Sequence, residues 1–75
     1  MYSEHEIIIL NENLPEYKIF KGDVGAIVAI YNNGEAFEVE FVTFSGVTVA
    51  LVTLKNSQIR KINSNELMTT RELVF

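Results

Sequence analysis

The sequence predicts an all-β fold: a small antiparallel barrel of about five strands, followed by a C-terminal extension. Two observations support this prediction. Apolar runs of strand length recur along the chain, and turns that contain glycine or asparagine separate them. The chain has 75 residues, which suits one domain with a small core. We therefore expect a barrel over residues 1–62 and a C-terminal tail over residues 63–75.

The stretch that organises the chain is residues 21–30, where a turn leads directly into a fully apolar strand. Asp23 can accept hydrogen bonds from nearby backbone N–H groups in an Asx-turn, while Gly22 and Gly25 free the backbone on either side. A glycine at the start of a strand often marks a bulge or a tight barrel corner. We interpret Gly22, Asp23 and Gly25 as structural turn residues, and we expect the other strands to lie against this one.

Residues 5–10 are predicted to form the first strand, and residues 11–18 form a loop because asparagine, proline and charged side chains break the pattern. This segment and the residues after it hold large apolar side chains, namely Leu14, Tyr17, Ile19 and Phe20. They are too apolar for a free loop, so we expect the segment to fold over one end of the core.

The organising strand extends over residues 24–31, and Asn32-Asn33-Gly34 follows. An Asn-Gly step between two apolar strands is a strong hairpin signal, and Gly34 is therefore expected at positive φ in a type I′ turn. The partner strand, residues 35–43, alternates cleanly. Its inward side chains are Phe37, Val39 and Phe41, and its outward ones are Glu38 and Glu40.

A second tight turn at residues 44–46 leads into residues 47–54, which contain no charged residue. A run of this kind promotes aggregation at a sheet edge, so we predict that it lies in the middle of the sheet. Residues 55–58 are expected to form a single helical turn, and residues 59–62 the last short strand.

Only one face of each strand fills the interior of a small barrel. This rule leaves apolar side chains on the face assigned outward: Ile27, Ala29, Val42, Ala50, Val52 and Leu54. Large exposed apolar patches usually mark contact sites, so Val52 and Leu54 are interpreted as partner-binding residues. The alternative is that the loop and tail of the same chain cover this face.

The tail, helical or extended, holds five large apolar side chains in nine residues: Leu67, Met68, Leu73, Val74 and Phe75. Chain ends usually fray and carry polar residues unless they are held in place. We expect the tail to dock on its own barrel or on a second chain, and we favour the second chain. These five residues complete the predicted partner-binding set, and truncation after Ile62 would separate the two cases.

The residues do not predict catalysis, a metal site or a cofactor. The chain has no cysteine and only one histidine, His5, without companions at ligand or triad spacing. Glu38 and Glu40 lie on an open strand face rather than in a cleft that would shift their pKa values. The turn at residues 22–25 leads into a strand, not into a helix N-terminus that could hold phosphate.

The charge balance and the hydropathy limit the partners that we expect. The formal net charge is −4 and the isoelectric point is about 4.8, which argues against binding to phosphate backbones. No run approaches the roughly 20 apolar residues of a membrane helix, and charged residues interrupt the N-terminus where a signal peptide would need apolar ones. We expect a cytoplasmic protein with a protein partner or a homo-oligomeric state, without a membrane or a small-molecule substrate.

Three stretches together resemble a family of short bacterial proteins, frequent in cyanobacteria, that is catalogued as a domain of unknown function. They are K-G-D-V-G-A-I-V, N-G-E-A-F-E-V-E-F-V and V-T-V-A-L-V-T-L, and the resemblance covers residues 7–62. It implies an SH3-like β-barrel and no established activity. Some members lie beside small toxin-like genes, which implies an immunity or antitoxin role. The tail departs from the family pattern.

Gly22-Asp23 before an apolar strand also resembles the KOW motif of ribosomal and transcription-factor SH3-like barrels. That motif mainly reflects barrel geometry, and the basic residues that would bind RNA are few: Lys18, Lys21, Lys55, Arg60 and Lys61. The sequence therefore favours a non-enzymatic protein-interaction module that binds a protein partner or itself. The alternative is a KOW-like nucleic-acid-binding barrel.

Overall fold

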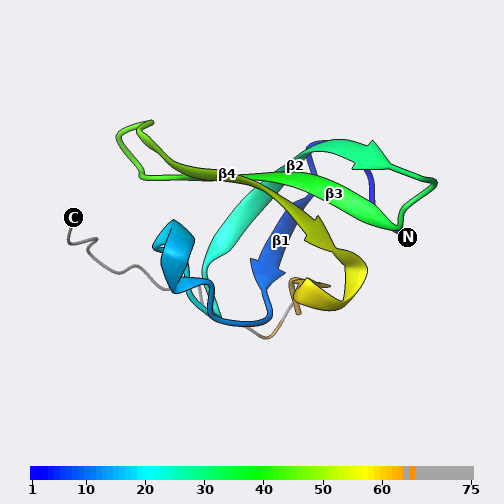
Figure 1. Ribbon diagram of the computed structural model, residues 1–75, viewed down its shortest axis with the longest axis horizontal. Helices are drawn as coiled ribbons and strands as arrows, with labels where there is room; N and C mark the ends of the chain where they lie inside the picture. Colours follow the sequence, from blue (N-terminus) through cyan, green and yellow to red (C-terminus); the bar gives the residue numbers. More distant parts are fainter. Residues whose placement is uncertain (64, 66–75) are drawn as a thin grey trace.

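The computed structural model describes residues 1–63 and residue 65 of the chain. In this part, five antiparallel strands form one sheet, and two short 3₁₀ turns lie in the loops between its first and second strands and between its fourth and fifth strands (Figure 1). The strands are β1 (Ile7–Leu10), β2 (Val24–Tyr31), β3 (Ala36–Val42), β4 (Thr48–Lys55) and β5 (Ile59–Lys61), and the 3₁₀ turns are η1 (Pro15–Tyr17) and η2 (Asn56–Gln58). The predicted all-β class is confirmed, and η1 is the one element here that the sequence did not predict.

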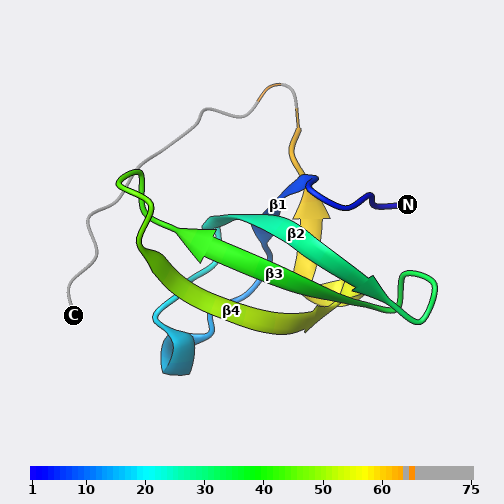
Figure 2. The ribbon, with the colours of Figure 1, turned by 90° about the horizontal axis from the view of Figure 1, so that it is seen from above.

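β2 is the central strand of the sheet, whose order is β4-β3-β2-β1-β5. Residues 24–26 pair with β1, and residues 26–31 pair with β3. The register shifts between Ile27 and Ala29, which leaves an extra residue where β2 passes from one partner to the other. In the part of the chain that the structure describes, the sheet is curled but not closed, because β4 and β5 at the two ends of the strand order do not pair with each other (Figure 2). This arrangement is compatible with an SH3-like barrel.

The turn between β2 and β3 uses three consecutive residues at positive φ. Asn32, Asn33 and Gly34 have φ angles of 51°, 57° and 98°. The N–H groups of Gly34 and Glu35 both donate to the carbonyl of Tyr31, at 3.1 and 3.2 Å. The prediction that Gly34 has positive φ is confirmed. The central pair of the turn is nevertheless Asn32-Asn33 rather than Asn33-Gly34, because the connection is one residue longer at its C-terminal side.

The core lies on the side of the sheet to which β3 directs Phe37, Val39 and Phe41, as predicted. The prediction for the other strands was wrong, since Ile27, Ala50, Val52 and Leu54 are also buried. Residues directly opposite one another in a β-ladder share a face. The register pairs Val39 with Ile27 and Val52, Phe37 with Leu54, and Phe41 with Ala50, and it therefore turns all four inward. Of the other residues assigned outward, Val42 is exposed and Ala29 is half-buried.

The placement of β4 in the middle of the sheet was also wrong. β4 pairs with β3 on one side only and ends the strand order. The position between β2 and β5 is filled by β1, which brings the N-terminal strand next to the last strand. A strand whose only charged residue is Lys55, at its C-terminal end, therefore forms an edge within the described part of the molecule.

Two segments outside the strands cover parts of the core. The loop after β1 buries Ile19 and half-buries Leu14, while Tyr17 and Phe20 stay exposed. The expectation that this segment folds over the core is thus confirmed for two of its four apolar side chains. At another place on the core, the half-buried Tyr2 packs its ring edge-on against Phe37, with the ring centres 5.1 Å apart.

Candidate protein-interaction surface

Two of the predicted partner-binding residues lie inside the fold. Val52 and Leu54 are 7% and 2% exposed, so they are core residues and cannot meet a partner. The assignment of these two residues to a contact surface was therefore wrong. The other five, Leu67, Met68, Leu73, Val74 and Phe75, lie outside the described residues.

The predicted turn residues are all placed by the structure, with different roles. The Asp23 carboxylate accepts a hydrogen bond from the Phe20 N–H at 2.7 Å, and Gly22 has a φ of 97°. The Asp23 carbonyl in turn accepts a hydrogen bond from the Leu10 N–H at 2.8 Å, which ties this turn to the end of β1. Gly25 is buried within β2 and faces Phe41, so it serves close packing rather than a turn.

Four exposed apolar side chains belong to the β3–β4 connection and the strands beside it, and of these only Val42 was assigned outward from the sequence. They lie at and beside the turn between β3 and β4, which projects from the body of the molecule in both ribbon views (Figure 1 and Figure 2). We call this set the β4 surface; its members are Val42, Phe44, Val47 and Leu51, which are 50%, 91%, 56% and 54% exposed. Leu51 lies opposite Glu40 in the ladder, and Val42 lies opposite Thr48.

The turn that carries Phe44 is held by a compact set of hydrogen bonds. The Thr43 N–H donates to the Val47 carbonyl at 2.9 Å, and the Val47 N–H donates to Thr43 Oγ1 at 3.1 Å. Thr43 Oγ1 and Ser45 Oγ are 2.9 Å apart, and Gly46 completes the turn at a φ of 90°. Phe44 is therefore presented to solvent by an ordered turn.

Among the described residues, β4 pairs with β3 alone, so its outer edge presents backbone groups without a strand partner next to this apolar tip. In an antiparallel ladder, alternate residues of an edge strand direct their N–H and C=O groups away from the sheet. No charged residue occurs from Val42 to Leu54. The nearest carboxylates belong to Glu38 and Glu40 of β3, and they accept hydrogen bonds from Thr53 and Thr48 of β4 at 2.6 and 3.4 Å. The edge is thus polar only through its backbone and these threonines.

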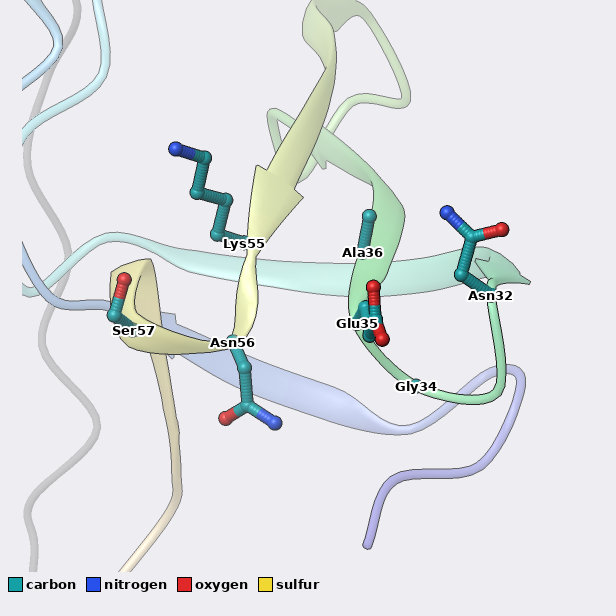
Figure 3. Close-up of a pocket in the computed structure, with 7 residues that line it drawn as sticks. All are labelled: Asn32, Gly34, Glu35, Ala36, Lys55, Asn56 and Ser57. Atoms are coloured by element: carbon teal, nitrogen blue, oxygen red, sulfur yellow. The ribbon is translucent and has the colours of Figure 1, made fainter.

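A shallow hollow of about 580 Å³ lies at the other end of β4 (Figure 3). It is formed between the β2–β3 turn and η2, where Ala36 and Lys55 are opposite one another in the ladder. Its lining residues are Asn32, Gly34, Glu35, Ala36, Lys55, Asn56 and Ser57. Within the described residues, no group of three or more His, Cys, Asp or Glu side chains could hold a metal ion. The volume of the hollow is large enough to receive a side chain.

One ion pair is formed near the N-terminus. Lys61 Nζ lies 3.0 Å from Glu6 Oε2 and 4.9 Å from the centre of the Tyr2 ring. Glu6 Oε1 also accepts a hydrogen bond from the Ser3 N–H at 3.0 Å. The hydrogen bond from Lys61, followed by the one from Ser3, lowers the pKa of Glu6 below its ordinary value. This cluster fastens the N-terminal segment to β5 and has the features of a structural site.

Sequence reasoning missed Phe44, Val47 and Leu51 as surface residues. A signal for Leu51 existed, because it pairs with the outward Glu40, but that signal needs the β3–β4 register. For Phe44, the signal was its place in a tight turn, where an aromatic side chain has little core to reach.

Comparison with known proteins identifies one family. The family model described as "Domain of unknown function (DUF4926)" matches residues 4–61. No curated protein and no solved structure matches the chain. Among the residues described, no helix has the length and hydropathy needed to cross a membrane.

Proposed function

The chain belongs to the DUF4926 family of domains of unknown function, and from this premise we propose that it is a non-enzymatic protein-interaction module that binds a protein partner or a second copy of itself. The observation that carries this proposal is the position of Phe44. This aromatic side chain is 91% exposed at the tip of a hydrogen-bonded turn, beside an open strand edge.

The energetics of an exposed aromatic tip favour binding. Fully burying a side chain of this size contributes roughly 1.5–3 kcal/mol, and aromatic anchors dominate many protein interfaces. The hydrogen bonds of the β3–β4 turn hold the backbone around Phe44 in one conformation in the unbound chain. Less conformational entropy is then lost on binding than for a free loop.

The charges of the chain argue for a protein partner over a nucleic acid. The formal net charge is −4, and the sequence holds only six Lys and Arg residues against ten Asp and Glu. One of these cations, Lys61, is paired with Glu6. A phosphate backbone is attracted by several clustered cations, so the KOW-like alternative has little support from composition.

In its narrower form, the proposal places the domain in the bacterial cytoplasm as an immunity or antitoxin-type protein, whose partner is a toxin encoded by an adjacent gene. The support for this form is the family resemblance stated above. In the same proposal the domain has no catalytic role, since the β4 surface presents apolar side chains and backbone groups rather than acid–base pairs.

Co-expression of the chain with the products of its neighbouring genes tests the proposal. We expect one protein to co-purify as a stable complex, or the chain to purify as an oligomer of defined size. Phe44→Ala should weaken that association by at least about tenfold, the effect of a side chain at an interface hot spot. Tyr17→Ala is the matched control, because Tyr17 is an exposed aromatic on η1, outside the β4 surface.

Two results would contradict the proposal. The first is a chain that is monomeric and binds none of the co-expressed proteins. The second is salt-sensitive retention of RNA with no protein bound, which would favour the KOW-like barrel.

A further inference from the structure

We propose that the occupant of the β4 edge is β4 of a second copy of this chain, paired antiparallel about a two-fold axis near Leu51, with Phe44 of each copy seated in the hollow of the other. This inference rests on the proposed function and specifies its partner. It combines three features that the structure places along one strand: the open edge, the apolar tip and the hollow.

The first step concerns the backbone. β4 spans eight residues, and within the described part of the molecule it has a neighbour on one side only. The other end of the sheet is β5, which has only three residues. A long, open edge is the more effective template for strand addition, because every second residue offers both a donor and an acceptor. Strand addition is therefore expected at β4.

The second step concerns charge. Two copies of a chain with a net charge of −4 repel each other unless the contact itself avoids charge. The edge meets this condition, because residues 47–54 carry no charge and Lys55 is the only charged residue of β4. In an antiparallel pair centred on Leu51, each Lys55 faces Val47 of the other copy, so the two ammonium groups lie at opposite ends of the contact. Self-pairing therefore brings no like charges face to face.

The third step concerns the two ends of the strand. Phe44 precedes Leu51 by seven residues, and Ser57 follows it by six. β4 extends three residues before Leu51, to Thr48, and four residues after it, to Lys55, which is about 10 and 13 Å at about 3.3 Å per residue. The turn that carries Phe44 lies beyond the first end, and the hollow lies at the second. Figure 2 shows the β3–β4 turn and the β2–β3 turn at opposite ends of the molecule. An antiparallel two-fold at Leu51 therefore places the tip of one copy at the same end of the joined strands as the hollow of the other, and the same contact forms twice.

The hollow suits an aromatic side chain. Ala36 and Gly34 supply apolar surface, while the polar and charged side chains of Asn32, Glu35, Lys55, Asn56 and Ser57 lie around it (Figure 3). An apolar centre with a polar rim is the usual arrangement at protein interfaces. Leu51 of each copy would meet its symmetry mate at the middle of the joined sheet.

Sedimentation and light scattering of the full chain over a range of concentrations test the inference. We expect a dimer, and we expect Leu51→Lys to raise the dimer dissociation constant by at least about tenfold, because it places two ammonium groups across the two-fold axis. Ile7→Lys is the matched control. Ile7 is similarly exposed and pairs with Ala26 on β2, but its strand, β1, lies three strands away from β4 in the sheet. It should leave the dimer unchanged.

Cysteine cross-linking tests the register independently of stability. The chain has no cysteine, so a single Leu51→Cys variant has only its own symmetry mate to react with. Mild oxidation should convert most of this variant to a covalent dimer, while an Ile7→Cys variant stays monomeric on a denaturing gel. Phe44→Ala should raise the dissociation constant of the same dimer that Leu51→Lys weakens. Tyr17→Ala should leave that constant unchanged.

The outcomes separate this inference from the function on which it rests. A monomer at all concentrations, or a dimer indifferent to Leu51→Lys, overturns the second copy as occupant. If that monomer forms a complex with a co-expressed protein and Phe44→Ala weakens it, the interaction function stands and the partner is that protein. If neither a dimer nor a complex forms, both proposals fall.

Discussion

Gly25 and Phe41 are packed so closely that a Cβ atom added to Gly25 would lie 2.8 Å from the Phe41 ring. The same atom would lie 2.7 Å from Val39 Cγ1. Both contacts are shorter than ordinary van der Waals separations, and both neighbours belong to the core of β3. Glycine at this position therefore sets how closely β2 can approach β3 where it passes over to β1.

The Gly25→Ala variant should consequently lose about 1–3 kcal/mol of unfolding free energy, the range for overpacking a core. Chemical denaturation followed by far-UV circular dichroism measures this loss. The same substitution in a Val39→Ala background should be less damaging, because one of the two close neighbours is then shortened. Equal stability of Gly25→Ala and the natural chain would show that the strands can move apart at no cost.

The Phe41→Ala variant should lose about 3–5 kcal/mol, since it removes a buried aromatic side chain. Phe41 is 3% exposed, whereas the next residue, Val42, is 50% exposed on the opposite face. Val42→Ala is therefore the matched control, and it should change stability by no more than about 0.5 kcal/mol. A larger loss for Val42→Ala than for Phe41→Ala would mean that the two faces of β3 are exchanged.

The sequence predicted the parts of the fold that depend on local signals. The alternation of Phe37, Glu38 and Val39 identified the faces of β3, and turn residues marked the ends of the strands. The faces of β4 carried no such signal, because its side chains are all uncharged up to Lys55. Thr48 and Thr53 lie an odd number of residues apart and yet both bond outward carboxylates. A register shift beside Val42 makes this possible, and a single sequence does not reveal it.

The prediction of the candidate site depended on which side chains of β4 face outward and on the order of the strands in the sheet. Once the inward and outward faces of β4 were exchanged, Ala50, Val52 and Leu54 were placed outside. The edge position of β4 follows from sheet order, which is a non-local property set by where β1 and β5 pair. Phe44 is different, since its exposure follows from the shape of one turn.

At the β2–β3 turn, Gly34→Val should be more destabilising than Gly34→Asn. Gly34 has a φ of 98°, and a β-branched side chain is strained at positive φ, whereas asparagine tolerates the left-handed region better. The space around Gly34 is open, with no atom within 4 Å of an added Cβ, so a clash cannot account for the difference. Thermal unfolding of the two variants measures it. Equal melting temperatures would show that the turn relaxes to negative φ without loss.

The ion pair between Glu6 and Lys61 should make stability depend on acid pH. The pKa of Glu6 is lowered in the folded chain from an ordinary value of 4.5, chiefly by its hydrogen bond from Lys61. A lowered folded-state pKa means that the carboxylate stabilises the fold above the ordinary value. That stabilisation is lost as the pH falls through the folded-state value.

A double-mutant cycle with Glu6→Gln and Lys61→Met isolates this contribution. We expect a small favourable coupling between the two residues at about pH 7, because the Lys61 side chain is 52% exposed and the Glu6 side chain 26% exposed, and ion pairs in contact with solvent contribute little. The coupling should vanish at about pH 2, where the carboxyl group is protonated, and it should shrink in high salt because exposed charges are screened. Lys61 also lies over the Tyr2 ring, and that contact is present in the Glu6→Gln variant, so the cycle separates the two roles of the lysine. A coupling that is the same at both pH values would show that the carboxylate charge is not what holds the N-terminal segment against β5.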